Sequence, residues 1–150
     1  MKTVLILAIG LVTTLSLGAQ SNEFLDQVLS EQELTYGSAS YLVLASAGLI
    51  DADATAEDAV AHLEREGMGL SGKMAETPLT IGEYSFLLMQ VYGLSGGILY
   101  RIVPGPRYAS RELSHRGIIQ GRAYPGMSIS AERGMRILGR VLQLDERGTL

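Results

Sequence analysis

The sequence predicts an all-α domain of about six helices arranged as a helical repeat. Three observations support this prediction: apolar residues recur at intervals of three and four, hydroxyl residues stand where helices would begin, and glycines stand where they would end. Runs that alternate between apolar and polar residues, which would indicate strands, do not recur. The length of 150 residues suits one domain, and a hydrophobic fraction of 47% supplies a packed core.

The first nineteen residues have the pattern of a signal peptide. Lys2 gives a positive start, an apolar run spans residues 4–17, and Ala19 ends a small-residue cleavage site. An uncleaved anchor is the alternative, but the run is shorter than the roughly 20 apolar residues that span a bilayer. We therefore expect export to the periplasm or the extracellular space, with no stable membrane insertion after cleavage. Because the sequence has no cysteine, lipid attachment to an N-terminal cysteine is excluded.

The remaining chain divides into an N-terminal helix at 20–35 and a helical-repeat domain at 36–147. Thr55 with Asp58, and Thr80 with Glu83, have the spacing of capping boxes, in which a hydroxyl and an acid satisfy free backbone N–H groups. In chain order the expected helix starts and stops are Ser21 or Asn22, Ser38 and Gly48, Thr55 and Gly67, Thr80, Pro106 and Gly117, and Ser130. The segment GILYRIV at 97–103 fits either a short strand or one helical turn, and the sequence does not decide between them.

A shift of fifty residues aligns two parts of the chain. It places residues 59–94 on 109–144, with matching glycine stops at Gly67 and Gly117 and matching caps at Thr80 and Ser130. The apolar residues of the helices that follow keep the same phase. Repeated helical units of this kind bury their apolar faces against one another.

These residues resemble the surface-layer homology (SLH) module. The resemblance rests on residues 108–121 (YASRELSHRGIIQG), followed by Pro125 and the sequence Ile129-Ser130-x-Glu132, and covers roughly residues 36–144. It implies three repeats in a pseudo-threefold prong that binds an anionic cell-wall polymer. The chain departs from the family in having no tryptophan, and in lacking the polymer-binding arginine of the Thr-Arg-Ala-Glu signature. The positions that match this arginine are Ala56, Ile81 and Ala131.

Charge is distributed unevenly. Residues 20–100 carry twelve acids and two basic residues, whereas residues 101–150 carry nine arginines and four acids. Such asymmetry indicates either two halves that neutralise each other or a basic surface for an anionic partner. Arginine suits the second role because its planar guanidinium binds carboxylate or phosphate through two hydrogen bonds.

The candidate ligand-binding site is the arginine-rich second half. Three arginines recur on one side of the last helix, two stand at i, i+4 on the helix before it, and a tyrosine lies beside them. Tyrosine can stack on sugar rings, and Tyr100, Tyr108 and Tyr124 are the tyrosines expected to be exposed, whereas Tyr84 is assigned to the core. The proposed ligand-binding residues are Arg107, Tyr108, Arg111, Arg133, Arg136 and Arg140.

Other chemistries find little support in the sequence. The segment that begins at Asp51 and Asp53 resembles the start of a calcium loop but has Ala56 and His62 where that loop needs glycine and an acid. His62 and His115 are not equivalent under the fifty-residue shift and have no local partners for a metal or a nucleophile. We therefore expect no metal site, no cofactor and no catalytic residue. The export signal and the net charge of −4 disfavour nucleic-acid binding.

The sequence thus predicts an exported, non-enzymatic module that binds an anionic polymer of the cell envelope. The alternative is a structural protein that docks on another envelope protein or on itself. A small hydrolase is the least favoured reading.

Overall fold

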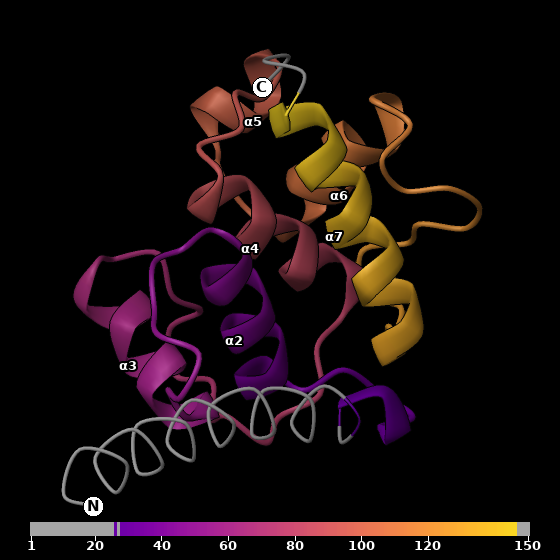
Figure 1. Cartoon of the computed structure of the whole chain (residues 1–150). Coiled ribbons are helices and arrows are strands. Elements are labelled where there is room, and N and C mark those ends of the chain that lie inside the picture. Colours follow the sequence, from indigo (N-terminus) through magenta and orange to yellow (C-terminus); the bar gives the residue numbers. More distant parts are fainter. Residues whose placement is uncertain (1–25, 27, 147–150) are drawn as a thin grey trace, which may run out of the picture.

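The computed structural model describes residue 26 and residues 28–146, and over this range it is entirely helical apart from loops and two isolated β-bridges (Figure 1). The predicted all-α class is confirmed. Residues 28–30 are helical, and six helices follow: α2 (Tyr36–Ser46), α3 (Ala56–Arg65), α4 (Ile81–Val91), α5 (Ile98–Ile102), α6 (Pro106–His115) and α7 (Ala131–Glu146). The expected signal peptide and the expected cap at Ser21 or Asn22 lie outside the described residues.

Most helix boundaries follow the local signals. Both predicted capping boxes form, at Thr55 with Asp58 and at Thr80 with Glu83. Pro106 is the first residue of α6, and the backbone N–H of Arg133 donates to the Ser130 hydroxyl at the start of α7. The segment 97–103, which fits either a strand or a helical turn by sequence, contains the short helix α5.

The expected start of α2 at Ser38 is wrong. The helix is capped three residues earlier by Thr35, whose hydroxyl accepts a hydrogen bond from the backbone N–H of Ser38. Ser38 itself is buried, and its hydroxyl donates to the carboxylate of Glu31. The start is displaced because the N–H groups of Tyr36 and Gly37 bond to the backbone carbonyls of Thr77 and Ala75, at 2.8 and 2.7 Å.

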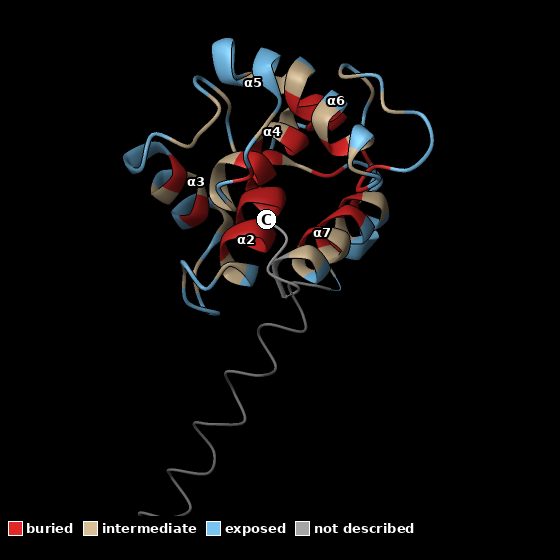
Figure 2. Ribbon diagram, turned by 90° about the horizontal axis from the view of Figure 1, so that it is seen from above, coloured by how far each residue is buried: buried red, intermediate tan, exposed pale blue. Residues whose placement is uncertain are grey.

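The core lies between α2, α4 and α7, with α3 packed on α2 and α6 packed on α4 (Figure 2). Two tyrosines are completely buried, and each phenol forms a hydrogen bond. The Tyr84 hydroxyl donates to the carbonyl oxygen of Gly134 at 3.0 Å, and the Tyr36 hydroxyl accepts from the backbone N–H of Leu70 at 2.9 Å. The assignment of Tyr84 to the core is confirmed. Hydrogen bonding removes most of the cost of burying a phenol among apolar side chains.

Three backbone hydrogen bonds form a closed ring at the N-terminal ends of α2, α4 and α7. The N–H of Leu34 donates to Ile129, the N–H of Leu79 donates to Leu34, and the N–H of Ile129 donates to Leu79, with N···O distances of 2.8, 2.8 and 3.4 Å. All three side chains are buried, and each residue immediately precedes the cap of one of these helices. The ring therefore fixes the starts of the three central helices relative to one another.

Two glycines allow loops to approach the starts of α2 and α4. The N–H of Gly82 donates to the carbonyl oxygen of Pro125 at 2.9 Å, just as the N–H of Gly37 donates to Ala75. A Cβ atom at Gly82 would lie 2.8 Å from that same oxygen, and one at Gly37 would lie 3.0 Å from the side chain of Ala56. The absence of side chains here lets loop carbonyls satisfy N–H groups that a helix start leaves unpaired.

Candidate functional site

The arginines of α7 lie along one side of the helix, and two of them hold the loop that precedes it. The guanidinium of Arg133 donates to the backbone carbonyls of Gln120 and Arg122, the first at 3.2 Å. Arg140 donates to the carbonyl oxygen of Ile118 at 3.0 Å and to the side-chain oxygen of Gln120 at 3.1 Å. These acceptors have no formal charge. The bonds orient both guanidiniums but do not neutralise them.

Arg136 differs from its two neighbours on α7. Its guanidinium lies 3.6 Å from the carboxylate of Glu132 one turn earlier, and both side chains are largely exposed. An exposed ion pair of this kind contributes between zero and about 1 kcal/mol and is easily exchanged for another anion.

The arginine side chains of α6, unlike those of α7, have no intramolecular partner among the described residues. Arg107 and Arg111 are exposed, and their side chains form no hydrogen bond or ion pair with any residue in the described part of the chain. They stand four residues apart, so both project from the same side of the helix.

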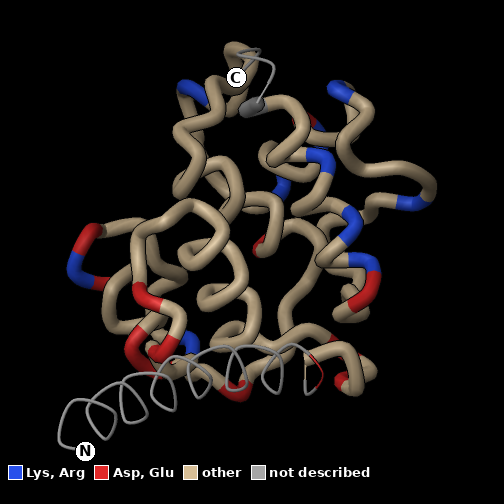
Figure 3. Tube along the Cα trace, viewed as in Figure 1, with Lys and Arg blue, Asp and Glu red and all other residues tan. Residues whose placement is uncertain are grey.

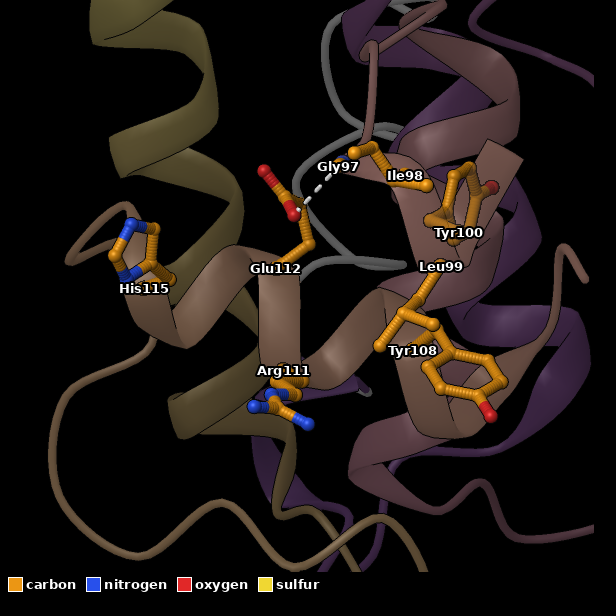
Figure 4. A pocket seen from close by; sticks show the side chains of 8 residues that line it. All are labelled: Gly97, Ile98, Leu99, Tyr100, Tyr108, Arg111, Glu112 and His115. Carbon is orange, nitrogen blue, oxygen red and sulfur yellow. Dashed lines mark hydrogen bonds between the residues drawn. The ribbon is translucent and has the colours of Figure 1, made fainter. Parts of the chain in front are cut away.

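A pocket of 310 Å³ lies between α5 and α6, beside Arg111 (Figure 4). Its walls are mainly aliphatic and aromatic, with one basic and one acidic side chain and a histidine at the rim. The lining residues are Gly97, Ile98, Leu99, Tyr100, Tyr108, Arg111, Glu112 and His115. Concave sites with apolar walls and a few polar groups are typical of small-molecule binding.

The tyrosines expected on the surface are not equally exposed. Tyr124 is 71% exposed, whereas Tyr100 and Tyr108 are half-buried where they line the pocket. The ring of Tyr100 packs at a tilt against Phe86 with centroids 6.4 Å apart, and burial raises the pKa of its phenol. The Tyr100 phenol therefore remains neutral at ordinary pH, and both pocket tyrosines offer partly accessible ring faces.

Glu112 connects the two walls of the pocket. Its carboxylate accepts a hydrogen bond from the backbone N–H of Gly97 at 3.0 Å and another from the guanidinium of Arg116, also at 3.0 Å (Figure 4). Partial burial alone would raise the pKa of Glu112, but these two partners together lower it. The Arg116 guanidinium also donates to the carbonyl oxygen of Ser95, so the segment before α5 is tied to α6 twice.

The two charged halves do not neutralise each other within the described residues. The three ion pairs there are Lys73–Glu83, Arg116–Glu112 and Arg136–Glu132, and each joins residues of the same half. Most acids lie around α3 and along the lower edge of Figure 3, whereas most basic residues lie along α7 and in the upper part of the molecule. This separation leaves the basic half able to attract an external anion.

The described residues contain no group of three or more His, Asp or Glu side chains placed to hold a metal ion. The segment that resembles a calcium loop leads instead into the Thr55–Asp58 capping box, whose hydrogen bonds lower the pKa of Asp58. The two histidines do not share a site, since His62 borders a hollow beside α3 and His115 borders the pocket at α6.

The structure brings only some of the predicted ligand-binding residues together. Tyr108 and Arg111 line the pocket, Arg107 follows on the same face of α6, and the three arginines of α7 form a separate row. Sequence reasoning singled out Tyr100 but missed Glu112, His115 and the aliphatic residues of α5 as parts of this site. The only local signal for α5 was an apolar segment between glycines, which does not reveal what it packs against.

Compared with models of protein families, with curated proteins and with solved structures, the chain shows no significant match. Within the described residues, none of the helices combines the length and apolar character required to cross a membrane.

Proposed function

We propose that the chain is an exported, non-catalytic module that binds an anionic polymer of the cell envelope. Residues 1–19 act as the signal peptide and residues 36–147 as the binding domain. The ligand contacts Tyr108, Arg107 and Arg111 first, and the exposed guanidiniums of α7 extend the basic surface beyond them.

One observation carries this proposal. Arg107 and Arg111 are exposed and unpaired within the described residues, and they stand beside a pocket with two partly accessible tyrosine rings. A saccharide carrying carboxylate or phosphate groups matches both features, because sugar rings stack on tyrosine and the anionic groups accept two hydrogen bonds from a guanidinium.

The ring of backbone hydrogen bonds supports an SLH-like arrangement of three helical units. In this arrangement α2, α4 and α7 are the equivalent second helices, beginning after Thr35, Thr80 and Ser130. In this register Tyr36 replaces Ala56, the position expected from the sequence, as the match to the missing family arginine in the first unit. Ile81 and Ala131 keep their places in the other two, and all three side chains are completely buried. Under this proposal the helical framework resembles that of the family, while the binding site lies on the face of α6.

The proposal is tested by retention of the purified protein on envelope glycan at low salt. We expect the parent protein to be retained and to be released as salt is raised, because the contacts are ionic. Arg107→Ala combined with Arg111→Ala should abolish retention, whereas Arg65→Ala, which removes an exposed arginine near the acidic residues of α3, should not. Absence of retention of the parent, or equal retention of all variants, would refute polymer binding.

The alternative function, docking on another envelope protein or on a second copy, draws on a different observation. Ile98, Leu99, Ile102 and Val103 are large aliphatic residues that lie on the surface. Exposed apolar patches mark interaction sites when they are contiguous. A stable oligomer that resists high salt would favour this alternative over polymer binding.

A further inference from the structure

α5 differs from the other helices in that its large aliphatic side chains are exposed. None of its five residues is buried, whereas each of the other five helices buries at least two. Ile98 is 76% exposed and Ile102 is 70% exposed, and Leu99 and Val103 are more than half exposed. Figure 2 shows α5 at the edge of the molecule, coloured mostly as exposed.

The surroundings of α5 are cationic. Residues 84–111 include no aspartate or glutamate, but they include Arg101, Arg107 and Arg111. The first acid that follows, Glu112, is engaged by the N–H of Gly97 and by Arg116. In sequence, α5 is therefore flanked by guanidinium groups, and the nearest acid is already engaged by two donors.

α5 is also held in a defined orientation. Tyr100 points back to Phe86, and its ring fills the space beside Gly96, where a Cβ atom would lie 2.5 Å from it. The hydrogen bond from Gly97 to Glu112 fixes the start of the helix. Because Tyr100 and Gly97 attach α5 to the body, its aliphatic side chains are presented outward before any partner arrives.

We propose that α5 inserts reversibly into the surface of an anionic lipid bilayer. Its aliphatic residues enter the boundary between headgroups and acyl chains, and Arg101 and Arg111 contact lipid phosphates. A five-residue helix cannot cross a bilayer, so the contact is peripheral. This role is distinct from polymer binding, although Arg111 and the pocket-lining residues Ile98 and Leu99 belong to both surfaces.

A bilayer fits α5 better than a protein partner does. A stable protein interface covers about 800 Å² on each partner and uses roughly 20–30 residues, whereas this patch is formed by a five-residue helix and the residue after it. Interfacial insertion needs only a few apolar side chains when neighbouring basic groups bind anionic lipid. Most of the acids lie on other parts of the molecule, so an anionic surface attracts the α5 side first (Figure 3).

The absence of tryptophan from the sequence permits a local test in the full chain. Ile102→Trp places a single tryptophan on α5. Met74→Trp places one at an equally exposed position outside α5 and serves as the control. On addition of vesicles containing phosphatidylglycerol, emission from Trp at position 102 should shift to shorter wavelength and be quenched by brominated lipid. Vesicles of phosphatidylcholine alone, and the Trp at position 74 with either vesicle, should give no shift.

Two charge variants in the Ile102→Trp background complete the test. Arg101→Glu should weaken binding to phosphatidylglycerol vesicles by about tenfold or more, since the substitution replaces attraction to the anionic surface with repulsion. Arg65→Glu should leave binding unchanged, and circular dichroism should show the same helix content in all variants. No shift at position 102, or the same affinity for Arg101→Glu, overturns the proposal. A shift that needs no vesicles and grows with protein concentration assigns the patch to a second copy instead and also overturns it. Because the vesicles contain no glycan, failure here is independent of the outcome of the polymer retention experiment.

Discussion

α6 and α7 both carry rows of arginine on their outer sides, but the two helices use them differently. On α7, Arg133 and Arg140 donate to carbonyl groups at 118–122, so their guanidiniums act as clamps for the loop that leads into the helix. On α6, Arg107 and Arg111 lie beside no such loop and have no partner within the described residues. Arginines at similar spacing therefore hold a loop in place on α7 but remain available to bind a ligand on α6. What separates the two roles is whether backbone carbonyls lie within reach.

The largest expected effect is on ligand affinity. Arg107→Ala plus Arg111→Ala should weaken binding to an anionic envelope glycan by about 100-fold, since two charge-assisted hydrogen-bonding groups are lost. Arg133→Ala plus Arg140→Ala should weaken it by at most about tenfold, because those guanidiniums are already engaged and contribute mainly through their charge. Titration calorimetry at one salt concentration measures both. Equal losses would remove the distinction between the helices.

The contrast should reverse when stability is measured. Arg133→Ala plus Arg140→Ala should lower the free energy of unfolding by about 2 kcal/mol, because carbonyl groups of the loop lose their donors. Arg107→Ala plus Arg111→Ala should change it by less than about 0.5 kcal/mol, as is usual for exposed residues without partners. Urea denaturation followed by circular dichroism provides both values. A destabilised α6 variant would show that its arginines have structural partners after all.

The smallest expected effect concerns the attachment of α5 to α6 through Glu112. Because its pKa is lowered in the folded state, Glu112 contributes stability above its ordinary pKa of 4.5 and loses that contribution as the pH falls through the lowered value. Glu112→Gln should therefore be less stable than the parent at pH 6, by less than about 1 kcal/mol, and the difference should shrink below pH 4. Glu132→Gln, which removes the exposed pair with Arg136, is the matched control and should show little difference at either pH. Thermal unfolding at the two pH values distinguishes them.

The sequence was sufficient wherever a structural feature depends on neighbouring residues. The boxes at Thr55 and Thr80 join groups three positions apart, and the glycine stops depend on the conformation of a single residue, as at Gly67 with φ +68°. Such features are visible in a short window. They gave the helical class and most helix boundaries.

The features that sequence reasoning misplaced depend on distant partners. Thr35 rather than Ser38 caps α2 because carbonyls near residues 75–77 bind the N–H groups that follow Thr35. The roles of Arg133 and Arg140 depend on a loop more than ten residues away, and the exposure of α5 depends on the packing of α4 and α6. Spacing within a helix identified a row of arginines but carried no information about the acceptors that the fold brings to it.

The ring that joins Leu34, Leu79 and Ile129 also constrains the order in which the molecule can be completed. The N–H of Leu34 donates to the carbonyl oxygen of Ile129, which lies 95 positions later in the chain. The carbonyl oxygen of Leu79 likewise accepts its hydrogen bond in the ring only once Ile129 has been synthesised. During synthesis, neither α2 nor α4 can reach its final setting before the last helix is being made, because closing such long loops is a late and slow event. A chain that stopped at residue 125 would contain five of these six helices but lack Ile129, which donates one hydrogen bond of the ring and accepts another. We expect such a chain to be degraded by proteases rather than to fold as a smaller domain.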